Sequence, residues 1–206
     1  MSILLKSCAV LALCLLGMSL AQAKESSTPW QTSYALEASG QYEQAAAVLV
    51  PLLGYGGSSE FALLRYGWLN YLQGNYNDSI RAYTRSLTRN TRSIDARLGI
   101  ALPLLVQQRW REAAKYAQQV IAVSPWNYSA HESLMRCEEG LKQWETLAKH
   151  ARDVSSYYPS VVAPYVYLAR ADLWLGQTDK AYAAYQQVLE RQPNHLEALR
   201  YLKIGK

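Results

Sequence analysis

Few side chains in this sequence are suited to catalysis or metal binding. Its three histidines are His131, His150 and His195, and no two of them have the spacing of a metal-binding motif such as H-E-x-x-H. Cys137 has no histidine at a motif distance, so we interpret it as a buried, inert thiol. The sequence contains no glycine-rich phosphate loop and no G-x-S-x-G turn. We therefore expect no enzymatic activity, no metal ion and no other cofactor.

Aromatic and basic side chains are the remaining source of specific chemistry. The 206 residues include 16 Tyr and 6 Trp but a single Phe. Tyr and Trp combine an apolar ring with a polar tip, which suits half-exposed surfaces and binding grooves. Arg81, Arg85 and Arg89 are spaced by four residues and so share one side of a helix. This stripe has two open interpretations, a solvated outer face or a contact with an anionic partner.

The overall composition is that of a folded protein. Half of the residues are hydrophobic and 18% are charged, which is unlike a disordered chain. The net charge is +5, with no long run of Lys and Arg. Nucleic-acid binding is therefore not predicted.

A turn motif recurs every 34 residues. The pattern Gly-x-aromatic-x-x-small occurs at 40–45 and 74–79, and the same register falls on 108–113, 142–147 and 176–181. Pro125, Pro159 and Pro193 are also 34 residues apart, and they follow the last three turns at a constant distance. Proline ends a helix because it lacks the N–H group and clashes with the preceding turn. Each unit is therefore predicted to be a helix, a turn, a second helix and a turn.

This pattern predicts five helix pairs and one final helix. The pairs are 27–39 with 43–53, 60–73 with 77–90, 94–107 with 111–124, 128–141 with 145–157, and 162–175 with 179–191; the final helix is 195–204. One helical hairpin cannot bury its apolar face alone, so such units are stable only as a stack. The final helix is expected to cap that stack.

The 34-residue period, the Gly-x-Tyr-x-x-Ala turn and the terminal proline resemble the tetratricopeptide-repeat family over residues 26–204. The resemblance implies an all-α, right-handed α-solenoid of five repeats, at 26–59, 60–93, 94–127, 128–161 and 162–194, with a cap at 195–204. In that family, a small residue of the first helix packs against a small residue of the second. The fourth repeat has Met135 and Leu147 at these places, which predicts a wider spacing between its helices.

In this family the first helices of the pairs line a concave groove that binds extended peptides. The inner wall implied for this chain includes aromatic, arginine and leucine side chains: Trp30, Tyr34, Arg65, Trp68, Tyr71, Leu102, Arg136, Tyr167, Arg170 and Trp174. Trp, Tyr and Arg dominate the energetics of protein recognition. For each residue, packing between repeats is the alternative role. Some members hold a C-terminal carboxylate with Lys and Asn; at the matching positions here only Arg65 is a cation, so that clamp is not predicted.

The expected function is that of a non-catalytic adaptor or scaffold that binds a segment of a protein partner in this groove, in envelope assembly or secretion. The alternative is a glycan-binding component of a polysaccharide export system. Peptide binding would depend on Arg65, Arg136 and Arg170, whereas binding of a neutral glycan would depend on Trp68 and Trp174. Self-association through one end or face of the array is a third possibility.

The N-terminus has the pattern of a secretory signal peptide. Lys6 precedes an apolar stretch at 9–20, and Ala21-Gln22-Ala23 matches the small-x-small cleavage pattern. We therefore predict a signal peptide at 1–23, with cleavage after Ala23, and a periplasmic protein. The apolar stretch is short, so a retained transmembrane anchor is not predicted.

Overall fold

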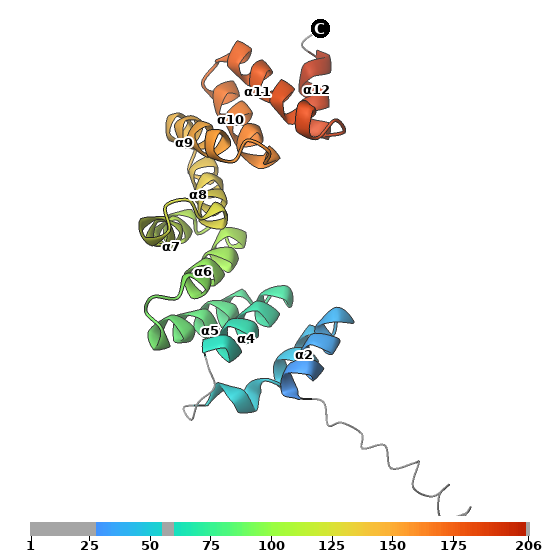
Figure 1. Ribbon diagram of the computed structural model, residues 1–206, viewed down its shortest axis with the longest axis vertical. Helices are drawn as coiled ribbons and strands as arrows, with labels where there is room; N and C mark the ends of the chain where they lie inside the picture. The colour runs from blue at the N-terminus through green and yellow to red at the C-terminus, as the bar shows by residue number, and fades with distance from the viewer. Residues whose placement is uncertain (1–27, 55–59, 205–206) are drawn as a thin grey trace, which may run out of the picture.

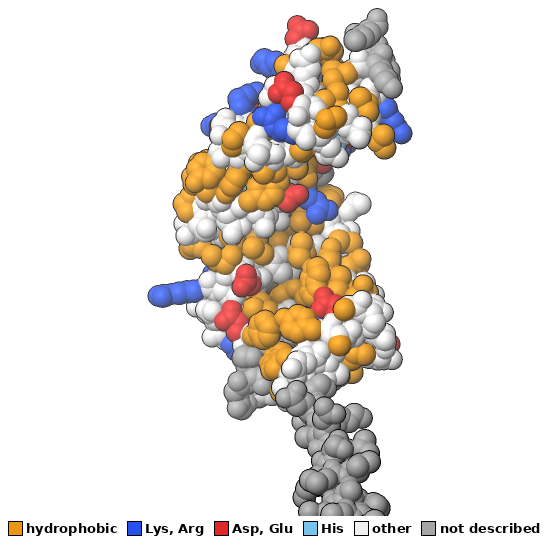
Figure 2. All heavy atoms as spheres, turned by 45° about the vertical axis from the view of Figure 1, so that its right-hand side comes forward, with side chains coloured by type: hydrophobic (Ala, Val, Ile, Leu, Met, Phe, Trp, Pro, Cys, Tyr) orange, Lys and Arg blue, Asp and Glu red, His pale blue; other side chains and the backbone are white. Residues whose placement is uncertain are grey.

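The protein is described by a computed structural model, which covers residues 28–54 and 60–204. All regular secondary structure in these residues is helical. The helices stack in a curved array, with α2 and α12 toward the right of the view in Figure 1 and α7 and α9 at the left. Figure 2 turns the right-hand, concave side toward the reader. The predicted all-α solenoid is confirmed.

The helices alternate between the two members of each repeat. The first helices are α2 (Pro29–Ala38), α4 (Glu60–Leu72), α6 (Ile94–Val106), α8 (Tyr128–Gly140) and α10 (Val162–Trp174). The second helices are α3 (Tyr42–Ala47) with the 3-10 helix η1 (Val50–Leu53), α5 (Tyr76–Arg89), α7 (Trp110–Val123), α9 (Trp144–Tyr157) and α11 (Thr178–Arg191), and α12 (Leu196–Ile204) ends the array. The predicted bounds agree to within two residues except in the second helix of the first repeat.

That exception is caused by Pro51. A single helix was expected over 43–53, but α3 ends at Ala47 and the chain continues as the short η1. Pro51 has no N–H group to donate to the carbonyl oxygen four residues earlier, so a regular α-helix cannot run through it. The first repeat consequently has a shorter second helix than the other four.

The turn inside each repeat requires a left-handed residue at the same position. Gly40, Gly74 and Gly176 have φ values of 76°, 79° and 71°, and Gln108 and Lys142 take the equivalent place with φ of 57° and 58°. Glycine adopts this conformation without strain, whereas a side chain makes it costly. The 34-residue spacing in the sequence is therefore the spacing of one backbone conformation, which two repeats adopt without glycine.

Each repeat is held together by a buried pair of residues on its two helices. The first-helix series is Ser33, Gly67, Ala101, Met135 and Ala169, and the second-helix series is Ala45, Ser79, Ala113, Leu147 and Ala181; all of these residues are buried. The backbones of α8 and α9 come close at fewer places than those of α4 and α5, α6 and α7, or α10 and α11. The wider spacing predicted from the two larger side chains of the fourth repeat is thus confirmed.

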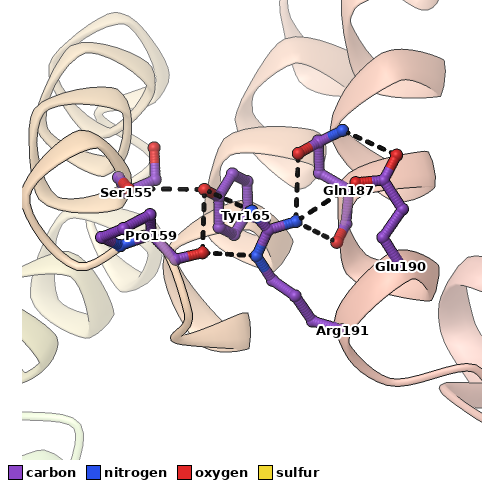
Figure 3. Close-up of polar contacts among 6 residues, drawn as sticks. All are labelled: Ser155, Pro159, Tyr165, Gln187, Glu190 and Arg191. Atoms are coloured by element: carbon purple, nitrogen blue, oxygen red, sulfur yellow. Dashed lines mark hydrogen bonds and ion pairs between the residues drawn. The ribbon is translucent and has the colours of Figure 1, made fainter.

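Arginines at the ends of second helices tie neighbouring repeats together. In Figure 3, Arg191 of α11 reaches the turn before α10: its Nε donates to the Pro159 carbonyl oxygen at 2.5 Å, and its Nη2 donates to the Tyr165 hydroxyl at 3.0 Å. The guanidinium carbon lies 4.1 Å from the centroid of the Tyr165 ring. This arginine therefore joins the fifth repeat to the end of the fourth.

The arginine stripe of α5 makes comparable contacts. Nη2 of Arg89 donates to the carbonyl oxygens of Leu53 and Gly54, at 3.2 and 3.0 Å, and Nη2 of Arg85 donates to that of Leu53 at 3.1 Å. These carbonyl groups lie at the end of η1, where no further helical turn satisfies them. Two arginines of the stripe thus stabilise the junction between the first and second repeats.

The structure does not address the prediction made for the N-terminus. The predicted signal peptide at 1–23 lies outside the described residues. Within residues 28–54 and 60–204, no helix combines the length and apolar character needed to cross a membrane.

Candidate functional site

A pocket of about 330 Å³ opens on the wall formed by the first three repeats. It is lined by residues from α2, α4, α5 and α6: Tyr34, Phe61, Leu64, Arg65, Trp68, Tyr83 and Asp95. Tyr34 and Phe61 remain 50% and 48% exposed and adjoin the other aromatic side chains of the lining, so they form one exposed apolar surface. Figure 2 shows that the lower half of the concave side carries many hydrophobic side chains with acidic ones among them. This pocket is the strongest candidate for a binding site.

Arg65 forms the polar back of the pocket, where it pairs with residues of α2. Its side chain is buried, its Nε donates to the Ser33 hydroxyl at 3.0 Å, and its Nη2 lies 2.7 Å from a carboxylate oxygen of Glu37. The Tyr34 ring covers one face of the guanidinium, whose carbon Cζ lies 3.4 Å from the centroid of that ring. Trp68 completes the cluster, because its indole N–H donates to Glu37 at 2.7 Å. Arg65 therefore positions the aromatic walls.

Tyr83 reaches this pocket from a second helix because two glycines leave space for its ring. A Cβ atom on Gly67 of α4 would lie 3.0 Å from the ring, and one on Gly99 of α6 would lie 2.3 Å from it. Any larger residue at Gly99 would displace the ring. Burial is the main cause that raises the pKa of Tyr83, with added contributions from Tyr71 and Asp95, so the phenol stays protonated. The floor of the pocket is therefore a neutral aromatic ring.

The remaining wall of the pocket region is aromatic. The rings of Trp68 and Tyr71 stack with centroids 5.5 Å apart, and Tyr71 lies 5.9 Å from Tyr76. The structure thus brings four predicted groove residues together on α2 and α4: Tyr34, Arg65, Trp68 and Tyr71. Their role in partner binding stays a prediction.

A second cluster centres on Arg170 of α10 and joins this helix to α8, α11 and α12. Nε and Nη2 of Arg170 donate to the two carboxylate oxygens of Glu197 on α12 at 2.8 and 2.6 Å, and Nη1 donates to Glu139 on α8 at 3.1 Å. The Tyr185 hydroxyl also donates to Glu197, at 2.7 Å. The hydrogen bond to Glu197 is the largest cause that raises the pKa of Arg170. Arg170 thus helps to dock the final helix, and its predicted contact with a partner stays a prediction.

Trp174 is the most exposed aromatic side chain of the predicted groove. It is 68% exposed and stacks on Trp144 with ring centroids 5.1 Å apart and an interplanar angle of 5°. One repeat earlier, Gly140 takes the place of Trp174, and a Cβ atom there would lie 2.5 Å from the Trp110 ring. Trp110 thus packs over a glycine, whereas Trp144 packs on a tryptophan that extends into solvent.

Three other predicted groove residues are held mainly by packing. Trp30 is partly buried with its ring centroid 5.1 Å from that of Phe61, and Leu102 is partly buried on α6. Tyr167 is 9% exposed and belongs to the core between α8, α9 and α10. Arg136, in contrast, is exposed on α8. For these four residues as well, a contact with a partner stays a prediction.

Sequence reasoning missed a buried polar cluster between α8 and α9. The histidines were treated as scattered, but Nδ1 of His131 lies 2.8 Å from Nε2 of His150, whose Nδ1 lies 2.9 Å from Glu138. Nε2 of His131 lies 2.7 Å from the Pro125 carbonyl oxygen, which can only accept, so this nitrogen carries the proton. Burial is the main cause that lowers the pKa of His131, which favours this neutral form. The cluster occupies the helix pair with the wider spacing.

This cluster could not be predicted from a short sequence motif, because His131 and Glu138 lie on α8 whereas His150 lies on α9. Within the described ranges, no group of three or more His, Cys, Asp and Glu side chains is placed to hold a metal ion. Cys137 is buried, as predicted, and burial raises the pKa of its thiol to about 12. Such a thiol stays protonated and is a poor nucleophile. We assign the polar cluster a structural role, linking α8 to α9 and to the preceding turn.

Family models match two parts of the chain. One model described as a tetratricopeptide repeat matches residues 32–97, and another of the same description matches residues 165–195. A comparison with curated proteins finds no match.

Solved structures with the same fold cover most of the chain at low sequence identity. MamA from Desulfovibrio magneticus RS-1 has a TM-score of 0.73 at 16% identity, covering 80% of this chain and 93% of its own. YrrB, described as a tetratricopeptide-repeat protein with an unusual peptide-binding site, has a TM-score of 0.71 at 15% identity, covering 85% and 90%. A thermophilic tetratricopeptide-repeat protein from Thermus thermophilus has a TM-score of 0.62 at 18% identity, covering 85% and 96%. At these identities the likeness establishes the fold.

Proposed function

The chain belongs to the tetratricopeptide-repeat family, and from this premise we propose that it is a non-catalytic scaffold that binds an extended segment of a protein partner along its concave wall. Repeat arrays of this kind are protein-interaction modules, because a curved stack presents a long continuous surface. The similarity to YrrB, which has a peptide-binding site, supports a peptide as the ligand.

The observation that carries this proposal is the aromatic pocket of the first three repeats. Its exposed Tyr34 ring packs on Arg65, which is held by Ser33 and Glu37, and its exposed Phe61 ring lies 5.1 Å from that of Trp30. Pre-positioned aromatic rings lose little conformational entropy on binding, and central aromatic residues are the usual energetic centres of protein interfaces. A partner segment therefore has an anchoring point here.

We place this scaffold in the bacterial periplasm, in envelope assembly or secretion. The support is the N-terminal sequence, with Lys6, the apolar stretch at 9–20 and the small-x-small site ending at Ala23. Fusing residues 1–30 to alkaline phosphatase, which is active only after export, tests the location. A fusion that stays inactive in the cytoplasm would refute it.

Affinity capture from periplasmic extract tests the function. The bait protein is compared with a Phe61→Ala variant and with a Val123→Ala control, because Val123 is a 64% exposed apolar residue outside the pocket. We expect one protein to be recovered by the wild type and by the control but not by Phe61→Ala. Equal recovery by all three baits would show that the partner binds elsewhere, and would refute the pocket as the binding site.

Glycan binding is a second candidate function, favoured by the Trp144–Trp174 pair. The Trp174 ring is 68% exposed and held parallel to Trp144, so its outer face is a flat apolar platform of the kind that sugar rings stack on. A Trp174→Ala variant distinguishes the two candidates. If it loses binding on a glycan array while Phe61→Ala does not, the glycan is the ligand.

A further inference from the structure

The charges around the pocket do not follow the charge of the whole protein. The chain has a net charge of +5, yet the charged side chains at the pocket are Glu37, Arg65 and Asp95. Glu37 and Arg65 neutralise each other at 2.7 Å. Asp95 lines the pocket, is partly exposed, and forms no salt bridge with any described residue. The lining of the pocket therefore carries one negative charge that no salt bridge compensates.

Binding of an anionic ligand group in this pocket would be unfavourable. Its cation, Arg65, is 6% exposed, donates to Ser33, pairs with Glu37 and has one face covered by Tyr34. A ligand carboxylate would have to break these contacts and approach Asp95 as a like charge. A cationic group meets no such obstacle, and the nearby aromatic faces attract it further.

The rest of the pocket is apolar and suits a large side chain. Its walls are the rings of Tyr34, Phe61, Trp68 and Tyr83 together with Leu64. A volume of about 330 Å³ is ample for one aliphatic or aromatic side chain. Burying such a side chain is strongly favourable, which is enough to fix the register of an extended segment.

We propose that this pocket anchors a large apolar side chain of the partner and that Asp95 selects a Lys or Arg next to that anchor. The inference rests on the proposed function and specifies the chemistry of the segment bound: apolar and basic. It also accounts for an unpaired carboxylate in the lining of an apolar pocket in a protein whose net charge is positive.

Asp95 has one other evident role, and the test must separate the two. It lies in the first turn of α6, two residues after the N-cap Ser93, where a negative charge stabilises the helix. That role predicts a change in stability for any substitution that removes the charge. It predicts no dependence on the charge of a bound peptide, so exchanging charges between protein and peptide isolates recognition.

The experiment selects a displayed library of short random peptides on the purified protein. Enriched peptides are synthesised with a fluorescent label, and their affinities are measured by anisotropy. We expect enriched peptides to share a large apolar residue with a neighbouring Lys or Arg. We expect Asp95→Lys to weaken their binding by about tenfold or more. Replacing the basic residue of the peptide by Glu should restore binding to Asp95→Lys, while Asp153→Lys, which alters an exposed carboxylate on α9, leaves affinity unchanged.

Two negative results have different meanings. If enriched peptides bind through the pocket, as judged by loss in Phe61→Ala, but show no basic residue and no sensitivity to Asp95→Lys, the inference is wrong and the proposed function stands. If no peptide binds the wild type more tightly than Phe61→Ala, the proposed function fails as well. Thermal denaturation of each variant shows whether it is folded, and Asp95→Asn, which keeps the shape of the side chain, replaces Asp95→Lys if the latter is not.

Discussion

Replacing Glu197 by Gln should loosen the final helix of the array. Glu197 lies in the first turn of α12 and accepts two hydrogen bonds from Arg170, at 2.8 and 2.6 Å, and one from the Tyr185 hydroxyl at 2.7 Å. Gln keeps the size of the side chain but removes its charge and turns one acceptor into a donor that faces Arg170. The bidentate, charge-assisted contact is therefore lost.

The size of the effect follows from how exposed the pair is. The side chains of Arg170 and Glu197 are 37% and 34% exposed. Exposed ion pairs contribute about 0.2–1 kcal/mol, and breaking a buried pair costs about 3–5 kcal/mol. For this partly screened bidentate contact we expect a loss of about 1–2 kcal/mol in the free energy of opening α12. The open population should then rise roughly 5- to 30-fold.

The pH dependence has a defined sign. The hydrogen bond from Arg170 is the largest cause that lowers the pKa of Glu197 below its ordinary value of 4.5; burial opposes this shift and Tyr185 assists it. Because the folded form binds its proton less readily than the unfolded form, the stabilisation is fully present above pH 4.5 and is lost as the pH falls through the lowered pKa. The Gln variant has no carboxyl group at this position and should lack that part of the acid sensitivity.

Hydrogen exchange measured by mass spectrometry on peptides from α12 reads the opening directly, after correction for the intrinsic exchange rate at each pH. Glu190→Gln serves as the control, since Glu190 is 62% exposed and lies 3.6 Å from Nη1 of Arg191. We expect α12 to be protected equally in the wild type and in this control at neutral pH. Equal protection of α12 in Glu197→Gln, or a wild-type helix whose protection does not fall in acid, would refute the reasoning.

Three further changes test the packing of the repeats. Gly99→Ala should lower the free energy of unfolding by about 1–3 kcal/mol, because the added Cβ would lie 2.3 Å from the Tyr83 ring; an unchanged urea midpoint would contradict this. Gln108→Gly should raise the free energy of unfolding by about 0.5–1 kcal/mol, since it relieves a φ of 57°, and a lower melting temperature would show the reasoning wrong. His150→Ala should cost about 1–3 kcal/mol by leaving Glu138 buried without its partner. Adding Glu138→Leu should recover part of that loss in urea denaturation, whereas a further loss would count against the buried pair.

Local information was sufficient for the helices and turns. Each turn has a left-handed residue at the same position of the repeat. The 34-residue period could therefore be recognised from the glycines at this position and the residues that follow them. The same spacing located Met135 and Leu147 as the departure in the fourth repeat, and the structure widens that pair. The prediction of one helix over 43–53 was wrong, and the cause is also local. Pro51 interrupts that helix, so α3 ends at Ala47.

Whether a groove residue is already bonded within the protein depends on side chains of other helices, and the sequence pattern does not show which of these come into contact. Arg65 and Arg170 are both arginines of first helices, but the contacts of Arg65 come from α2 and those of Arg170 from α8 and α12. The same is true of His131 and His150, which meet only because α8 and α9 pack together. The 34-residue period determined the backbone of this protein, because each turn and helix depends on neighbouring residues. Only the tertiary structure decided which side chains are already paired and which, like Asp95, still face the open pocket, because those partners lie on separate helices brought together by the stack.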